Sequence, residues 1–223
     1  MNKELFKKAL IRFSCGLIIV GAILFISAGT LSYPQGWLFM SVLFIPMFIA
    51  GLVMLKKDPE LLRRRLEAKE EESVQQKIIL LSAIMFLAAF IAAGISFRFD
   101  LFMIPLSGSI IASVVFLASY GLYAEVMREN SYLSRTIKVE EDQEVVDTGL
   151  YGIVRHPMYM ATLILFEAMP LVLGSLLSLV IMLTYIPLII SRIRNEEEVL
   201  ERELKGYTEY KKKVKYRLIP FLW

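Results

Sequence analysis

The sequence contains one cysteine and one histidine among 223 residues. Cys15 has no second cysteine with which to form a disulfide within the chain, and Cys15 and His156 alone cannot supply the four ligands of a zinc site. No G-x-G-x-x-G fingerprint of the soluble dinucleotide-binding fold is present. Positive and negative side chains nearly balance, 25 against 22, and no Lys/Arg-rich face alternates with aromatic residues. The sequence therefore predicts no metal site and no nucleic-acid partner.

Hydrophobic residues, in contrast, make up 57% of the chain, above the roughly 45–50% that is usual in soluble domains. Four long apolar runs account for the excess: Ala9–Leu31, Trp37–Leu55, Ile78–Phe97 and Met103–Met127. Each run approaches or exceeds the roughly 20 residues that cross a bilayer as a helix. The first is too long for a signal-peptide core and no clear cleavage site follows it. We expect an all-α, polytopic integral membrane helical bundle with four N-terminal spans.

The distribution of lysine and arginine predicts how these spans are oriented. Basic residues cluster before the first run, in the 56–77 loop, in the 128–157 loop and in the tail after Ile190. The opposite connections, near 32–36 and 97–100, hold one arginine between them. The positive-inside rule therefore places both termini and the two basic loops in the cytoplasm. Within the 56–77 loop, a surface helix is expected to begin near Asp58-Pro59.

The apolar stretch from Met158 to Ile190 needs a different interpretation. As one continuous helix it would be about 50 Å long, and a single crossing would export the basic tail. Pro170 and the Gly174-Ser175 pair mark a turn near its middle. We predict a C-terminal helical hairpin with arms at roughly 158–173 and 176–190. The chain then divides into residues 1–127, with four transmembrane helices, and residues 128–223, with most of the functional polar groups.

Charged residues stand at both ends of this hairpin. Arg155 and His156 precede it, while Arg192 and Glu196 follow it, four residues apart on one helical face. Pro157 favours an extended His156 and suits the first turn of the next helix. Taken singly, each charged residue is also explained as a positive-inside residue or as part of a surface salt bridge at a helix end. Their ordered spacing favours a site at the mouth of the hairpin.

Glu167 lies inside the first arm of the hairpin. An ionised carboxylate at membrane depth is costly, so it is expected to face the bundle interior or a hydrated cavity. Our preferred interpretation is structural, with a hydrogen bond across to Thr184 or Ser178, and a substrate contact is the alternative.

Three motifs in the final part of the chain carry a family resemblance. They read G-x-Y-x-x-V-R-H-P-x-Y from Gly149, R-I-x-x-E-E-x-x-L from Arg192, and G-Y-x-x-Y-x-x-x-V-x-Y-R-L-I-P from Gly206. In this order, around an apolar hairpin, they resemble the isoprenylcysteine carboxyl methyltransferase family, within a wider group that includes phospholipid methyltransferases. The resemblance runs from about Gln143 to Pro220. Ala161 departs from it, since relatives often carry glycine there.

This resemblance implies methyl transfer from S-adenosylmethionine to a lipid or lipidated acceptor, such as a prenylated cysteine carboxylate, at a cytoplasmic site. Arg192 takes the substrate-binding and catalytic position. The resemblance also implies that the cofactor is bound by Gln143, Glu144, Val145, Val146, Tyr151, His156, Pro157, Met158, Tyr159 and Glu196. Arg155 is added to this set because a guanidinium suits the carboxylate of the cofactor.

The chemistry of the acceptor decides whether a base is needed. A carboxylate acceptor is already ionised at neutral pH, whereas an amine must lose a proton, for which Glu196 or Glu197 is the candidate base. Two other functions stay open. An NADPH-dependent membrane reductase is one, because sterol reductases share R-H-P-x-Y and Y-R-x-x-P blocks, although E-E-x-x-L favours the methyltransferase. A non-enzymatic membrane protein or small transporter is the other.

Overall fold

The computed structural model describes residues 3–67, 73–130, 132, 139 and 143–223. The predicted 56–77 and 128–157 loops lie partly outside these residues. Throughout the described part the regular secondary structure is helical, and five helical stretches are long and apolar enough to cross a membrane. The all-helical, polytopic bundle is thereby confirmed. Its elements are α1 (Lys3–Ala28), α2 (Pro34–Lys57), α3 (Pro59–Glu67), α4 (Ser73–Phe99), α5 (Leu106–Glu129), η1 (Gly149–Gly152), α6 (Pro157–Val172), α7 (Leu176–Met182), α8 (Tyr185–Glu203) and α9 (Tyr207–Lys213).

The four predicted N-terminal runs correspond to α1, α2, α4 and α5, with shifted ends. The helix of α5 begins at Leu106 rather than at Met103, because Pro105 takes an extended conformation as its N-cap. The predicted surface helix is α3, and it begins at Pro59. Asp58 stabilises this start, since its Oδ1 accepts a hydrogen bond from the Leu61 amide at 3.0 Å.

After α6 the chain turns back at the predicted position. Gly174 has a φ of +77°, which a residue with a side chain rarely adopts. The Ser175 hydroxyl then accepts a hydrogen bond from the Ser178 amide and caps α7. This turn lies against the α4–α5 connection through a short bridge between Met103 and Ser175.

The prediction of one helix over 176–190 was wrong. The second arm consists of α7, which ends at Met182, and α8, which continues to Glu203. Pro187 explains the break, since it has no amide hydrogen and its ring conflicts with a helical carbonyl at Leu183. The longer α8 carries Arg192 and Glu196 on a helix that extends beyond the apolar segment.

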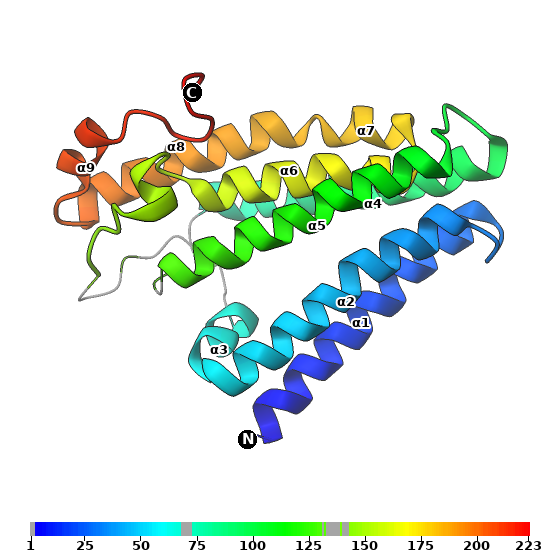
Figure 1. Ribbon diagram of the computed structural model, residues 1–223, viewed down its shortest axis with the longest axis horizontal. Helices are drawn as coiled ribbons and strands as arrows, with labels where there is room; N and C mark the ends of the chain where they lie inside the picture. The colour runs from blue at the N-terminus through cyan, green and yellow to red at the C-terminus, as the bar shows by residue number, and fades with distance from the viewer. Residues whose placement is uncertain (1–2, 68–72, 131, 133–138, 140–142) are drawn as a thin grey trace.

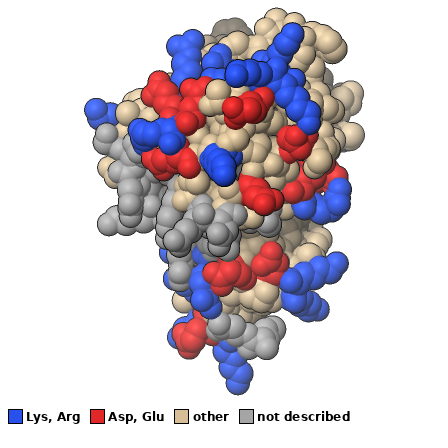
Figure 2. All heavy atoms as spheres, turned by 90° about the vertical axis from the view of Figure 1, so that its left-hand side faces the viewer, with Lys and Arg blue, Asp and Glu red and all other residues tan. Residues whose placement is uncertain are grey.

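The helices place polar connections at one end of the molecule (Figure 1). The N-terminus, α3, η1, the end of α8 and α9 lie at that end, whereas the α1–α2, α4–α5 and α6–α7 turns lie at the opposite end. Figure 2 faces the first end and shows lysine, arginine, aspartate and glutamate side chains gathered over it. We call it the polar end.

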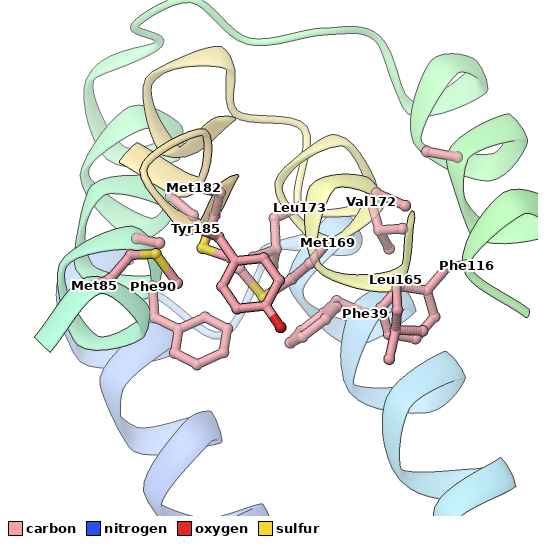
Figure 3. Close-up of a cluster of buried hydrophobic side chains, with 14 of the residues drawn as sticks. Phe39, Met85, Phe90, Phe116, Leu165, Met169, Val172, Leu173, Met182 and Tyr185 are labelled. Atoms are coloured by element: carbon pink, nitrogen blue, oxygen red, sulfur yellow. The ribbon is translucent and has the colours of Figure 1, made fainter. Parts of the chain in front are cut away.

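The core joins α2, α4, α5, α6 and α8 (Figure 3). Phe39 of α2 lies between Phe90 of α4 and Phe116 of α5, with ring centroids 5.7 and 5.9 Å away. α1 and α4 cross so closely at Gly94 that an added Cβ would lie 1.9 Å from Ser27 Oγ. These contacts hold the bundle that supports the polar end.

Candidate functional site

A buried carboxylate, Glu197 of α8, organises the polar end. Its Oε1 accepts a hydrogen bond from Arg155 Nε at 2.7 Å, and its Oε2 accepts one from Arg217 Nε at 2.8 Å. His156 Nε2 lies 3.3 Å from the same Oε1. Glu197, Arg155 and His156 are exposed by 3, 7 and 5% respectively. The cluster joins the segment before α6, the α8 helix and the C-terminal tail by charge-assisted bonds.

The third motif supplies the other half of this junction, a role that sequence reasoning did not assign. The Arg155 amide donates to the Tyr216 carbonyl at 2.9 Å, and the His156 amide donates to the Arg217 carbonyl at 2.8 Å. Arg155 Nη1 donates to the carbonyls of Val214 and Lys215 at 2.7 and 2.9 Å. The V-x-Y-R stretch therefore fixes the R-H-P stretch, although the two lie far apart in the sequence.

A second polar network surrounds the hydroxyl of Tyr159. This hydroxyl accepts a hydrogen bond from Arg192 Nε at 2.9 Å and donates one to Glu196 Oε2. Arg192 Nη1 donates to Gln75 Oε1 at 2.8 Å, and Gln75 Nε2 donates to Asn195 Oδ1 at 2.6 Å. The fully buried Gln75 comes from α4. Sequence reasoning missed it, because nothing in its own neighbourhood distinguishes it from the polar flank of a span.

The predicted cofactor residues converge on one pocket at the polar end. All of them except Pro157 line it, together with Arg192. Pro157 instead forms the first residue of α6. The pocket is also lined by residues that the prediction did not include: Asn130, Tyr132, Leu200, Leu204, Tyr207 and Tyr210. Glu197 is not part of the lining and is bonded to cations, so it is the weaker of the two carboxylates proposed as a base.

Three tyrosines of the pocket wall, Tyr151, Tyr207 and Tyr210, have pKa values raised by burial and are neutral hydrogen-bonding groups. Tyr210 donates to the Tyr151 carbonyl at 2.7 Å, and the Asn130 side chain donates to the Tyr151 hydroxyl at 3.1 Å. Burial raises the pKa of Tyr151, and the hydrogen bond from Asn130 acts in the opposite direction. Burial also raises the pKa of Tyr207, whose hydroxyl has no hydrogen-bond partner among the described residues. The wall thus contains a buried, protonated phenol without a hydrogen-bond partner among the described residues.

The Glu167 carboxylate does not form the hydrogen bond that we expected from the sequence. Both of its carboxylate oxygens are buried, and neither has a hydrogen-bond partner within the described chain. Thr184 Oγ1 donates instead to the Ile181 carbonyl at 2.7 Å, and the Ser178 hydroxyl is likewise without a partner there. The predicted bond from Glu167 to Thr184 or Ser178 was therefore wrong.

Comparison with known proteins confirms the family resemblance over part of the chain. Residues 110–202, from within α5 to near the end of α8, match the model of the isoprenylcysteine carboxyl methyltransferase (ICMT) family. A curated relative is the Delta(14)-sterol reductase TM7SF2 of Mus musculus, 33% identical over 91 residues. That match covers 40% of this chain and 22% of the reductase, so this chain spans about a fifth of that relative.

Proposed function

We propose that this protein transfers a methyl group from S-adenosylmethionine to a membrane-associated lipid or lipidated acceptor. The observation that carries the proposal is the pocket at the polar end. Residues from all three motif blocks line it, although those blocks lie before and after the apolar hairpin. The match of residues 110–202 to a family of membrane methyltransferases supports the same reaction.

The chemistry of the lining suits this cofactor. S-adenosylmethionine would supply an electrophilic methyl group, and it presents a cationic sulfonium, an amino group, ribose hydroxyls and an adenine ring. Carboxylates of Glu144 and Glu196 suit the cationic and hydroxyl groups, while the aromatic face of Tyr159 suits a sulfonium. The buried Tyr207 hydroxyl offers an additional hydrogen bond. Apolar side chains such as Val145 give the adenine ring a surface on which to lie.

Arg192 is the residue we assign to the acceptor. Gln75 and Tyr159 hold its guanidinium, which lines the pocket from α8. A guanidinium fixes a carboxylate bidentately, and an ionised carboxylate needs no base. Alignment of donor and acceptor and exclusion of water then lower the barrier, by up to about 7–11 kcal/mol for well-oriented groups. For an amine acceptor, Glu196 is the base we favour.

The membrane placement follows from the same distribution of charge. We place the polar end, both termini and the pocket in the cytoplasm, with α1, α2, α4 and α5 as four spans. The shorter apolar α6 and the α7–α8 arm form the hairpin that enters and leaves on the cytoplasmic side. Residues 1–127 then provide the membrane scaffold, and residues 128–223 provide the methyltransferase region.

NADPH-dependent reduction is the second candidate, favoured by the similarity to the mouse sterol reductase. Its cofactor carries several phosphate charges that require cations. Among the described residues two arginines line the pocket, and the Nε of Arg155 is already bonded to Glu197. Glu144 and Glu196 add negative charge to the same wall. This balance favours the cationic methyl donor over the anionic dinucleotide.

Two measurements test the proposal. Calorimetric titration of S-adenosylmethionine and NADPH into the purified protein should show binding of the first and not of the second. The protein and native lipid extract are then incubated with methyl-labelled cofactor, and the labelled lipid is identified. Glu196→Gln should lose labelling, whereas Glu198→Gln, an exposed neighbour, should retain it. Binding of NADPH alone would establish the reductase, and binding of neither cofactor would favour a non-enzymatic protein.

A further inference from the structure

A second cavity lies between α1, α2 and α3, apart from the candidate pocket. Its volume is about 420 Å³, within the range of roughly 300–1,000 Å³ that is typical of small-molecule sites. Apart from two arginines the described residues of the walls are apolar, with Phe13 of α1, Phe48 of α2 and Leu62 of α3 among them. We call this cavity the α1–α3 groove.

Two glycines help to keep the groove open. Gly16 of α1 and Gly51 of α2 both line it, and a Cβ added at Gly51 would meet no atom within 4 Å. On α1 the lining extends from Phe6 to Gly16, about 15 Å along the helix axis. The groove is therefore an elongated apolar hollow that follows two predicted membrane helices. Its shape and lining suit a hydrocarbon chain.

Arg65 of α3 gives the wall of this groove an unusual charge. Its Nη1 donates to the Tyr123 hydroxyl at 2.8 Å, and its guanidinium carbon lies 5.5 Å from the centre of the Tyr123 ring. The other two guanidinium nitrogens, Nε and Nη2, are buried without a hydrogen-bond partner among the described residues. Buried donors of a charged group are costly when they are unpaired. Arg12, the other arginine of the wall, donates to the Leu66 carbonyl.

The two unpaired donors define the chemistry of a ligand, which would reach them once the Arg65 side chain, covered in this structure, turns toward the groove that it lines. Nε and Nη2 lie on the same edge of the planar guanidinium, and their N–H bonds form the fork that a carboxylate accepts bidentately. We propose that the α1–α3 groove binds a single-chain amphiphile with a carboxylate headgroup, of the fatty-acid type. The chain lies along Gly16 and Gly51, and the carboxylate pairs with Arg65. This proposal does not depend on methyl transfer, because neither the groove nor Arg65 belongs to the candidate pocket.

A fluorescent fatty acid and its neutral ester provide the test. cis-Parinaric acid and its methyl ester are titrated separately into the full-length protein in phosphatidylcholine nanodiscs. The acid should bind roughly tenfold more tightly than the ester, because the ester cannot form a charge-assisted pair with the guanidinium. Equal affinities would overturn the proposal. Native mass spectrometry then identifies any lipid that stays bound to the protein. If a two-chain phospholipid remains bound and the acid fails to displace it, the proposal is also overturned.

Variants of Arg65 separate the headgroup contact from the apolar contact. Arg65→Gln should remove the preference for the acid and leave the weaker binding of the ester unchanged. Arg65→Lys keeps the charge but loses the fork, so it should retain only part of that preference. A preference that persists in Arg65→Gln would show that the carboxylate binds elsewhere.

Filling the hollow tests the position of the chain. Gly51→Phe should abolish binding of both probes. The matched control is Gly121→Phe on α5, where an added Cβ also meets nothing within 4 Å but which does not line the groove. If thermal unfolding shows that Gly51→Phe is destabilised, Gly51→Leu provides the smaller obstruction. Binding in a folded Gly51 variant equal to that of Gly121→Phe would overturn the proposal.

Discussion

Arg155 and Glu197 form a buried ion pair, 2.7 Å between Nε and Oε1, that joins the start of α6 to α8. Arg217 and His156 contact the same carboxylate, and Lys211 Nζ lies 4.0 Å from its Oε2, so four basic side chains surround one acid. The arrangement holds both arms of the hairpin and the C-terminal tail in fixed relation to the pocket. Arg155 therefore positions the site as well as lining it.

Glu197→Gln should destabilise the protein strongly, because it leaves two buried or partly buried guanidinium groups without their counter-charge. Breaking a buried pair from one side typically costs about 3–5 kcal/mol. Thermal unfolding in the same detergent measures the loss. Glu198→Gln, one residue along the chain and exposed, is the control, and it should change stability by less than about 0.5 kcal/mol. Equal melting temperatures for the two variants would refute the organising role of Glu197.

Glu196→Gln should weaken cofactor binding and leave the stability of the protein unchanged, the opposite of what we expect for Glu197→Gln. The side chain is only partly buried and lines the pocket, and its described hydrogen bond comes from the Tyr159 hydroxyl, which an amide oxygen can still accept. We expect S-adenosylmethionine affinity to fall at least roughly tenfold, as for loss of one charge-assisted bond. The melting temperature should stay near that of the parent. Calorimetry with the purified variant decides, and unchanged affinity would remove Glu196 from the cofactor site.

Glu167 leads to a prediction about stability that follows from its missing partners. Glu167→Gln or Glu167→Met should leave the protein as stable as the parent or make it more stable, since no hydrogen bond is lost and a carboxyl group that is buried without partners is replaced. Thermal unfolding tests this. A marked loss of stability would show that the carboxylate has a partner after all. Loss of turnover with unchanged stability would instead favour a substrate contact.

The sequence predicted the elements of this fold better than their detailed ends. Apolar runs, Pro157 and the Gly174 turn placed the helices, because length, proline and glycine act locally. The break before Tyr185 was missed, although Pro187 carries the signal for it. At the site, the spacing of the motifs predicted a set of residues, and all of them except Pro157 line one pocket. Gln75 and the unpaired Glu167 depend on how distant helices approach one another, which no local pattern encodes.

The predicted orientation of the chain leads to a labelling experiment. In a Cys15→Ser background, a cysteine placed at exposed Lys212 should react with a membrane-impermeant maleimide only after the cells are permeabilised. A cysteine at exposed Ser32, in the α1–α2 turn at the opposite end, should react in intact cells. This expectation follows from the positive-inside distribution of lysine and arginine. Labelling of the Lys212 position from outside would overturn the cytoplasmic placement of the pocket.

Arg192 and Glu196 share the Tyr159 hydroxyl, yet we assign them to different ligands. Arg192→Lys keeps the positive charge but loses the planar fork that is bonded to Tyr159 and Gln75. Turnover should therefore fall at least about a hundredfold, the scale expected when reacting groups are misplaced. S-adenosylmethionine affinity should stay within a few-fold of the parent.

The competing explanation is that Arg192 only holds Tyr159 and, through it, Glu196. In that case Arg192→Lys should lose cofactor affinity to the same extent as Glu196→Gln. Tyr159→Phe separates the two roles, because it removes the shared hydroxyl and leaves both charges in place. If Arg192 acts on the acceptor, adding Arg192→Lys to Tyr159→Phe should reduce turnover further while cofactor affinity stays at the level of Tyr159→Phe alone. If Arg192 acts only through the hydroxyl, the second change should have no additional effect on either quantity.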